Sequence, residues 1–490
     1  MQNIEEIMQE REKKLEHIKN LGIYPFGHKY ERSCSIAEIL EKYKDLPKNE
    51  KREKDIFSVA GRIKSIRKHG KLIFIDIEDS SEKMQILLEL NTLGKKNFEF
   101  IELLNIGDFI GTSGYIFRSA TNELTIWVKS YELLCKSLRP LPSEWHGLKD
   151  TEIRYRQRYA DMIINPDVRK VFVQRSMILA EIRGFMQKKG FVEITTPTLQ
   201  PIYGGAFAEP FVTHHNALDM DLYLSISPEL YLKRAIVGGF EKVYEICRNF
   251  RNEGIDTKHN PEFTMMESYW AYADYNDNMK LTEELISMLI KKINSSFVIK
   301  YKNLDLNFEP PWKRLTMKDA IMQYLNINVD MPLEELRKKA VKIGIKDAES
   351  MAWGKIVEKI FEEVEPKIIQ PTFIIDFPTE ISPLAKQKPD NPKLTERFEL
   401  IIHGIEYANA YSELNDPIEQ AERFKEQAKQ RAEGDKEAQQ TDTDFVRALE
   451  YGMPPTSGLG IGIDRLIMLL TNSQSIRDVI MFPTLRKEGV

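Results

Sequence analysis

The first 21 residues carry the spacing of an amphipathic helix. Their apolar positions are Ile4, Ile7, Met8, Leu15, Ile18 and Leu21. Because residues three and four apart share one face of a helix, the pattern predicts a helix over residues 3–21 that ends at Gly22. We favour a helix that packs on its own domain over an arm that binds RNA or a protein partner.

Residues 56–135 change to short β-branched and aromatic runs separated by glycine and polar turns. The predicted strands are 57–63, 72–77, 84–88, 108–116 and 124–128, with a helical segment near 96–104. This pattern is typical of a small Greek-key barrel of the oligonucleotide-binding (OB) type. Basic residues crowd its start, at Lys51, Arg52, Lys54, Arg62, Lys64, Arg67, Lys68 and Lys71. With Phe74 among them, they favour RNA binding over a merely solvated face.

The pattern becomes mixed from about residue 147. A proline-containing linker (136–146) precedes it, and a long helix over 167–189 and a strand ending at Pro197 follow. Further strand-like runs are 209–214, 222–226, 242–250, 263–273 and 371–377, and residues 278–365 are mostly helical. Strands that do not alternate regularly with helices favour an antiparallel or mixed sheet. Another helix begins at Pro417, behind a capping aspartate.

Composition narrows the class of protein. The 490 residues include 70 basic and 75 acidic ones, a net charge of −5, and 42% are hydrophobic. These values are typical of a globular chain of two to four domains and exclude a disordered or fibrous one. The chain has no run of 18 apolar residues, no secretory signal pattern and three scattered cysteines. We therefore expect a cytoplasmic protein in a reducing compartment, without a membrane segment.

A strand, a polar loop and a second strand carry the first candidate chemistry. Arg251 follows the strand 242–250, His259 and Asn260 lie in the loop, and Phe263 opens the next strand. An arginine fork suits a carboxylate or a phosphate, and an aromatic face suits a nucleotide base. By itself, the pattern is more often that of a solvated loop and a core phenylalanine.

A glycine-rich segment is the second candidate. Gly458, Gly460 and Gly462 precede Arg465, with a spacing that differs from the dinucleotide-binding fingerprint. The better interpretation is a strand that runs into a buried helix, with Arg465 at the junction and room for a flat ligand. Tight packing of the strand on the helix explains the glycines equally well.

Five acids in or beside apolar runs are the third candidate: Glu229, Glu267, Glu399, Glu406 and Glu413. A buried carboxylate is costly unless a cation, a metal ion or hydrogen-bond donors face it. The alternative for each is a place on the surface.

These segments resemble the signature motifs of the class II aminoacyl-tRNA synthetases. Residues 190–197 are similar to motif 1, residues 250–267 to motif 2 and residues 458–465 to motif 3. The sequence resembles those of the bacterial class II lysyl-tRNA synthetases over nearly the whole chain. Examples are Ser-Pro-Glu-Leu-Tyr-Leu-Lys-Arg at 227–234 and Asn-Ala-Tyr-Ser-Glu at 409–413.

The resemblance implies an α+β fold: a five-stranded OB-fold barrel, then a class II catalytic domain with a mostly antiparallel sheet flanked by helices. The implied domains are an N-terminal helical extension (1–55), the anticodon-binding barrel (56–138), a linker (139–150) and the catalytic domain (151–490), with a helical insertion at about 278–365. A homodimer through motif 1 is also implied.

The resemblance further implies that lysine reacts with ATP to give lysyl-adenylate and pyrophosphate, and that lysine then passes to the 3′ end of tRNA(Lys). The implied catalytic residues are Arg251 and Arg465. The implied ATP contacts are Arg251, Glu253, His259, Asn260, Phe263 and Arg465. The implied lysine contacts are Gly205, Glu229, Arg251, Glu267, Tyr269, Asn409, Tyr411 and Glu413. Glu399 and Glu406 would bind Mg²⁺, and Arg67, Phe74 and Gln85 would contact the anticodon.

Three other interpretations compete. An aspartyl- or asparaginyl-tRNA synthetase shares both domains, but its pocket should offer cations where this chain offers Glu229, Glu267 and Glu413. The related enzyme that adds lysine to elongation factor P lacks the barrel. An RNA-binding protein with an inactive core is disfavoured because the motif arginines and acids are present. Two segments depart from some family members: Lys258 replaces an arginine, and Ala408-Asn409-Ala410-Tyr411 stands where they have Gly-Asn-Gly-Phe.

Overall fold

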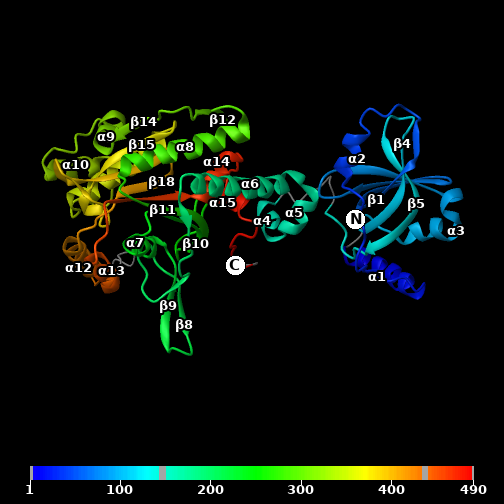
Figure 1. Cartoon of the computed structure of the whole chain (residues 1–490), viewed down its shortest axis with the longest axis horizontal. Coiled ribbons are helices and arrows are strands. Elements are labelled where there is room, and N and C mark those ends of the chain that lie inside the picture. The colour runs from blue at the N-terminus through cyan, green and yellow to red at the C-terminus, as the bar shows by residue number, and fades with distance from the viewer. Residues whose placement is uncertain (1–3, 143–149, 433–439, 488–490) are drawn as a thin grey trace. The chain divides into compact units, whose positions relative to one another are not determined.

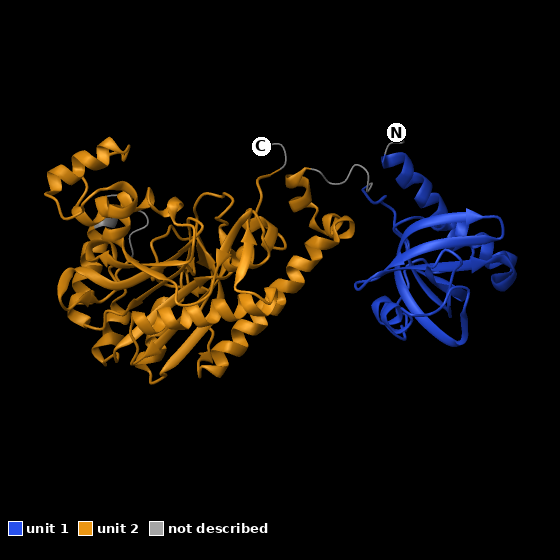
Figure 2. Ribbon diagram, turned by 90° about the horizontal axis from the view of Figure 1, so that it is seen from above, with its two compact units in different colours: residues 1–149 blue, residues 150–490 orange. Residues whose placement is uncertain are grey.

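The computed structural model describes residues 4–142, 150–432 and 440–487, so most of the predicted linker lies outside the described residues. The chain divides into two compact units, residues 1–149 and 150–490 (Figure 1, Figure 2). No helix among the described residues combines the length and the apolar composition that a membrane span requires.

Unit 1 contains a closed five-stranded barrel with the strand order β1–β2–β3–β5–β4. Its strands are β1 (Lys51–His69), β2 (Leu72–Glu78), β3 (Lys83–Glu89), β4 (Phe109–Arg118) and β5 (Leu124–Cys135). Helix α3 (Leu90–Phe100) and a short 3₁₀ turn (Ile101–Leu103) follow β3. Alternate residues such as Ile73, Ile75 and Ile77 point into the barrel and are buried. The predicted barrel is confirmed.

The N-terminal helix α1 (Ile4–Asn20) packs on the barrel, and a second helix, α2 (Ile36–Lys42), follows it. Leu15 and Ile18 are buried, whereas Ile4 is exposed although the pattern placed it on the same apolar face. Arg11 is buried instead, and its Nη1 donates to the carbonyl oxygens of Ser137 (3.1 Å) and Arg139 (3.3 Å). The packing interpretation is correct, but a charged residue shares the contact.

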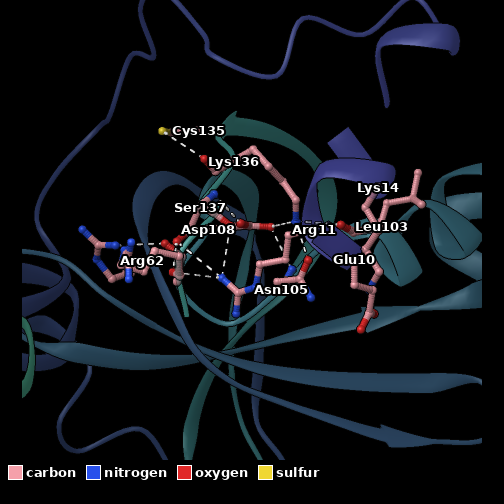
Figure 3. A network of polar contacts seen from close by, with 12 residues as sticks. Glu10, Arg11, Lys14, Arg62, Leu103, Asn105, Asp108, Cys135, Lys136 and Ser137 are labelled. Atoms are coloured by element: carbon pink, nitrogen blue, oxygen red, sulfur yellow. Dashed lines mark hydrogen bonds and ion pairs between the residues drawn. The ribbon is translucent and has the colours of Figure 1, made fainter. Parts of the chain in front are cut away.

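A buried ion pair joins Asp108, just before β4, to Lys136, just after β5 (Figure 3). The Nζ atom of Lys136 donates to Leu103 O (2.8 Å), Asn105 Oδ1 (2.6 Å) and Asp108 Oδ2 (2.7 Å). Asp108 also accepts from the backbone N–H groups of Asn105 (2.8 Å) and Ser137 (2.7 Å). Lys136 therefore belongs to the core of unit 1, within the barrel bounds that the resemblance implies (56–138) and not in the linker that the prolines indicate (136–146).

Unit 2 is built on a nine-stranded sheet within its described residues. The order is β14–β15–β17–β18–β19–β11–β10–β6, and β16 pairs with β17. The strands are β6 (Val192–Glu193), β10 (Lys242–Phe250), β11 (Glu262–Ala271), β14 (Lys313–Thr316), β15 (Thr372–Pro378), β16 (Gln387–Lys388), β17 (Asn391–Ile402), β18 (Ile405–Ser412) and β19 (Thr456–Gly462). Pairing is antiparallel except for β14–β15 and β10–β6. The predicted mixed, mostly antiparallel sheet is confirmed.

Helices cover one face of this sheet (Figure 1). They are α6 (Pro166–Lys188), α8 (Tyr275–Asn294) and α14 (Ile463–Leu470). Met266, Leu459 and Ala408 point to this face and share one apolar core with Leu285 and Ile286 of α8. Since strand side chains alternate between faces, their neighbours point to the opposite face, which carries the polar residues described below.

The segment 278–365 is not a helical insertion as predicted. Helix α8 belongs to the central core, and β14 is the edge strand of the main sheet. Between them lies the hairpin of β12 (Val298–Tyr301) and β13 (Leu304–Asn307). Helices α9 (Met317–Leu325), α10 (Leu333–Lys342) and α11 (Trp353–Glu362) then pack around their own apolar cluster.

A small sheet, six further helices and two 3₁₀ turns complete the described part of unit 2. A small sheet has the order β7–β9–β8, with β7 (Leu199–Gln200), β8 (Val212–His215) and β9 (Met220–Leu224). The helices are α4 (Thr151–Arg156), α5 (Arg158–Ile164), α7 (Glu229–Val237), α12 (Pro417–Ala432), α13 (Thr443–Glu450) and α15 (Ile476–Val479), with short 3₁₀ turns at Glu365–Lys367 and Thr379–Ile381. Asp416 caps α12 as predicted, since its Oδ1 accepts from the Ile418 N–H at 2.8 Å.

Candidate active site

The polar face of the large sheet forms the floor of a cavity of about 380 Å³ in unit 2. Every candidate residue that the sequence places in the catalytic domain lines this cavity. These residues are Gly205, Glu229, Arg251, Glu253, His259, Asn260, Phe263, Glu267, Tyr269, Glu399, Glu406, Asn409, Tyr411, Glu413 and Arg465. Segments far apart in the sequence thus meet at one site.

Strand register arranges the floor in two rows that cross β17, β18, β19 and β11. In this order, the first row is Arg397, Tyr411, Gly458 and Tyr269. The second row is Glu399, Asn409, Gly460 and Glu267. Each row has side chains from three strands and a glycine from β19. Because the glycines have no side chain, they leave space in the middle of the cavity floor.

Two of the glycines are required by close packing. A Cβ atom on Gly458 would collide with Oε1 of Glu413 and with the ring of Tyr269. Gly205 has a φ of +85°, and a Cβ there would meet Glu229 Cβ at 2.8 Å. The structure therefore supports the interpretation of the glycine-rich strand as one side of a ligand site.

Glu413 is a fully buried carboxylate in the cavity wall. Its Oε2 forms an ion pair with Lys233 of α7, and its Oε1 has no hydrogen-bond partner among the described residues. Burial raises the pKa of Glu413 well above its ordinary value, and the Lys233 ammonium opposes this shift. A buried acceptor without a donor is costly, so this oxygen marks a place for a cationic or donating ligand.

Glu229 lies beside Glu413 and is held by two donors. Nζ of Lys233 lies 2.5 Å from its Oε1, and the Tyr411 hydroxyl lies 2.7 and 2.8 Å from its two carboxylate oxygens. The tyrosine that replaces phenylalanine in this chain therefore does more than form an aromatic wall, because its hydroxyl orients an acid of the cavity.

Glu267 is the third acid of this group. The Ser227 hydroxyl donates to its Oε1 (2.8 Å) and the Tyr269 hydroxyl to its Oε2 (3.1 Å). Burial, with the nearby Glu229, raises the pKa of Glu267 to about 8. The protonated form of Glu267 is therefore favoured near neutral pH.

Arg251 follows β10 and brings a positive charge to the cavity. Its backbone N–H donates to Pro261 O (2.9 Å), and its guanidinium carbon lies 5.0 Å from the centroid of the Phe263 ring. Its Nε is buried and has no hydrogen-bond partner in the described part of the chain. Burial lowers its pKa. A buried guanidinium with an unused donor suits an anionic ligand group.

Arg465 begins the helix after the glycine-rich strand, as predicted. Its Nη1 donates to Glu406 O (2.8 Å) and lies 3.3 Å from Glu406 Oε2, and its Nη2 lies 3.2 Å from Nε2 of His259. The preceding residue, Asp464, accepts from the Thr264 N–H (2.7 Å) and pairs with Arg175 of α6 (2.5 Å). These bonds fix the guanidinium plane beside the motif 2 loop.

Glu399 and Glu406 are the acids predicted to bind a metal ion. Oε1 of Glu399 lies 2.6 Å from Nη2 of Arg397. Burial raises the pKa of Glu399 to about 8; Arg397 opposes the shift, whereas Glu406 and Glu365 add to it. Their carboxylate oxygens are donors of the kind that Mg²⁺ prefers. Within residues 4–142, 150–432 and 440–487, no group of three or more acidic, histidine or cysteine side chains could hold a metal ion. Two acids suit Mg²⁺, which usually takes its other ligands from water and phosphate.

Two charged residues of the site escaped the sequence analysis. Lys233 pairs with two acids of the wall, and Arg397 pairs with Glu399 and donates to Asn409 Oδ1 at 3.2 Å. A signal existed for both: Lys233 lies four residues after Glu229 on a helix, and Arg397 lies two residues before Glu399 on a strand, so each shares a face with its acid.

The predicted anticodon contacts share one outer face of the barrel in unit 1. Arg67 of β1 is the cross-strand partner of Phe74 of β2. Asp76, two residues further along β2, is the partner of Gln85 of β3. The Arg67 guanidinium donates to both oxygens of Asp76 (3.0 Å each) and to Gln85 Oε1 (3.0 Å). The structure thus brings the three residues together and adds Asp76, which the sequence analysis did not consider.

Comparisons with known proteins find a matching family model for each of the two units. Residues 150–486 match the family model of the class II tRNA synthetases (D, K and N), and residues 57–134 match the OB-fold nucleic acid binding domain. The chain is 53% identical to a lysine–tRNA ligase of Carboxydothermus hydrogenoformans, over 99% of each chain. It is 52% identical to that of Pelotomaculum thermopropionicum (99% and 96%) and 50% identical to that of Thermotoga maritima (99% and 96%).

Proposed function

The chain belongs to the lysine–tRNA ligases of the class II aminoacyl-tRNA synthetases, and from this premise we propose that its cavity activates L-lysine with ATP and that its barrel binds the anticodon of tRNA(Lys). The chemistry is adenylation of the lysine carboxylate, with release of pyrophosphate, followed by transfer of lysine to the 3′ end of the tRNA.

The observation that carries this proposal is the unpaired Oε1 of the buried Glu413 in the cavity wall. The side-chain ammonium of lysine supplies the donor that this oxygen lacks, and Tyr269 lines the cavity beside it. Glu229 and the backbone at Gly205 then receive the α-amino group, and Glu267, Asn409 and Tyr411 complete the pocket. An amino acid with an uncharged side chain would leave Oε1 of Glu413 without a donor, and a site rejects the wrong substrate by a large factor in this way.

Arg251 holds the reacting groups together. The lysine carboxylate is the nucleophile and the α-phosphate of ATP is the electrophile, so both bring negative charge to one place. The unused Nε of Arg251 and its stacking on Phe263 place a positive charge there. Positioning and charge neutralisation are what an in-line displacement at phosphorus requires, and no side-chain nucleophile takes part.

The adenine of ATP fits between Phe263 and Arg465, with Glu253, His259 and Asn260 around it. Oδ1 of Asn260 is buried without a hydrogen-bond partner in the described residues, and His259 is fixed by Asp256 (2.9 Å) on one side and Arg465 on the other. These groups orient the nucleotide and leave its α-phosphate facing Arg251.

Glu399 and Glu406 would hold Mg²⁺ on the phosphates of ATP. The ion supplies positive charge that stabilises the departing pyrophosphate. Arg397 keeps Glu399 in place, and Lys258, whose Nζ lies 3.4 Å from Gly404 O, lines the same cavity.

The barrel reads the anticodon through stacking and base-edge contacts. Phe74 offers a ring, while Arg67 and Gln85 offer donors and acceptors on the same face. Splayed bases are recognised in this way in single-stranded RNA.

We also propose a cytoplasmic homodimer formed through α6 and the strands that follow it. Val173 and Met177 lie one turn apart on α6 and are 60% and 62% exposed. Val192 and Leu199 are also exposed. Exposed apolar side chains on α6 and on the strands that follow it suit burial in an interface.

The test is amino-acid-dependent exchange between ATP and pyrophosphate, with purified protein, Mg²⁺ and each of the twenty amino acids in turn. We expect exchange with lysine alone. Exchange with aspartate or asparagine would overturn the pocket assignment and keep the class II core. No exchange with any amino acid would leave only an RNA-binding role. Arg251→Ala should abolish the exchange while the protein stays folded.

A further inference from the structure

Lys233 packs behind the cavity wall and has no part in the reaction described above. It lies on α7, four residues after Glu229, and its side chain is fully buried. Its ammonium lies 2.5 Å from Oε1 of Glu229 and pairs with Oε2 of Glu413. Both acids line the cavity and Lys233 does not. Lys233 thus holds the two acids from the side that a ligand in the cavity does not reach.

Aromatic rings complete the surroundings of this ammonium. Its Nζ lies 5.6 Å from the ring centroid of Tyr411, 5.8 Å from that of Phe445 and 6.0 Å from that of Tyr269. Burial alone lowers the pKa of Lys233, but Glu229 and Glu413 outweigh it and the net shift is upward. Lys233 therefore stays charged although it has no contact with water.

The net charge of this part of the site is equal and opposite to that of the lysine zwitterion. Glu229, Glu267 and Glu413 bring three carboxylates, and Lys233 and Arg251 bring two cations, which leaves one negative charge when all are ionised. The lysine zwitterion brings two ammonium groups and one carboxylate, a net charge of +1. Without Lys233 the same site would carry two negative charges, and one buried acid would have to take up a proton.

We propose that Lys233 is a positioning residue for lysine specificity: it pairs with one oxygen of each of Glu229 and Glu413, so that their other oxygens face the substrate ammonium groups. The inference rests on the proposed lysine activation. Lys233 acts through the two acids and does not touch the substrate.

The test is the kinetics of lysine-dependent ATP–pyrophosphate exchange in Lys233→Met, which keeps the length of the side chain and removes its charge. Because one partner of a buried charged group is removed, we expect the KM for lysine to rise about 30-fold or more. The KM for ATP should stay within about twofold, since Lys233 faces the amino-acid part of the cavity. An unchanged KM for lysine, or an equal rise in both KM values, would overturn the proposal.

The pH profile separates positioning from a loss of structure. The titratable and charged groups around the two acids are Lys233, Arg251, Glu267, Tyr269 and Tyr411. In Lys233→Met one further acid is protonated near neutral pH, so the KM for lysine should fall more steeply with rising pH than in the wild type. Parallel profiles would contradict the proposal. Lys136→Met, which removes an equally buried ammonium from the barrel, is the matched control and should leave both KM values for exchange unchanged.

A second pair of variants decides the matter if Lys233→Met does not fold. Lys233→Arg keeps the charge and should bring the KM for lysine to within about tenfold of the wild type. Lys233→Ala leaves room for a small cation, and ethylammonium chloride should lower its KM for lysine where sodium chloride does not. A charge-keeping variant as impaired as Lys233→Ala, with no response to ethylammonium, would overturn the inference. Absence of lysine-dependent exchange in the wild type would instead refute the proposed function.

Discussion

Lys136 in the barrel and Lys233 in the catalytic unit are both fully buried and both paired with carboxylates, but their surroundings differ. Lys136 uses its three N–H donors on three acceptors, and its partner Asp108 is fully hydrogen-bonded (Figure 3). Lys233 meets two carboxylates, and one oxygen of Glu413 remains without a donor among the described residues. Burial lowers the pKa of Lys136 although Asp108 opposes it, whereas the pKa of Lys233 is raised.

This difference separates a structural ion pair from a ligand site. A buried ion pair whose carboxylate and ammonium both have their hydrogen-bond partners is stable without a ligand. A cluster with a surplus of acids stays costly until a cation arrives. The excess of acids around Lys233 is where our proposal places the ammonium groups of the substrate, whereas the carboxylate beside Lys136 is already paired.

The largest effect should come from Glu413→Gln, which removes the charge that the substrate ammonium is proposed to meet. We expect kcat/KM for lysine in the exchange reaction to fall on the order of 10³-fold, because a buried charged partner is lost. The KM for ATP should change little. Asp108→Asn makes the same change beside Lys136 and should leave the exchange reaction intact. A loss of less than tenfold in Glu413→Gln would show that this oxygen is not the ammonium acceptor.

The next effect should be a loss of stability in Lys136→Met. Asp108 would stay buried without its cation, and breaking one side of such a pair costs about 3–5 kcal/mol. Hydrogen–deuterium exchange of the β5 amides, read by mass spectrometry, measures this loss within the barrel. The double variant Lys136→Met/Asp108→Asn removes both charges and keeps an acceptor for the backbone N–H groups, so it should recover part of the loss. A double variant as unstable as the single one would mean that the pair is not what holds the strand end.

The sequence predicts the fold better than it predicts the counter-ions. Strands such as β2 and β10 follow from alternation and composition, and the five acids and two arginines of the site follow from motif resemblance. Lys136 stands before two prolines and was assigned to the linker, because no local pattern shows that Asp108 lies in contact with it. The burial of Arg11 among the apolar positions of α1 could not be predicted either. Its acceptors are the carbonyl oxygens of Ser137 and Arg139, which lie far from it in the sequence.

Strands that line the cavity were the hardest to predict. β17 and β18 form a hairpin around His403 and Gly404, both with positive φ, yet neither was among the predicted strands. Their cavity-facing residues include Arg397, Glu399 and Asn409, which are polar and are weak strand formers. Because these residues line a site, the alternation of apolar and polar positions that predicts a strand is hard to see in the sequence.

A smaller effect concerns pH. Glu267 has a pKa of about 8 in the empty cavity, raised by burial and Glu229. Below pH 8 it carries a proton that must leave when the lysine ammonium groups bind, so the proton competes with the substrate. The KM for lysine should therefore fall as pH rises, by about tenfold per unit below pH 8. Exchange kinetics between pH 6 and 8.5 measure this slope. Glu267→Gln has no such proton, and a slope that persists in it would assign the titration to another group.

The smallest effect, and the one that tests the division between the two units, should come from Phe74→Ala. The ring is half-buried on the outer face of the barrel, edge-on to His69 at 6.1 Å, and carries none of the barrel's inward packing. Loss of one base stack costs about 1–3 kcal/mol, so the KM for tRNA(Lys) in aminoacylation should rise about tenfold. Lysine-dependent exchange needs no tRNA and should stay within about twofold. Thr112→Val, which removes a buried hydroxyl of β4 that has no hydrogen-bond partner among the described residues, serves as a control for small structural changes in the barrel. If Phe74→Ala also lowered the exchange rate, the barrel would contribute to the fold of the catalytic unit, and the contrast between a self-contained barrel and a ligand-dependent cavity would fail.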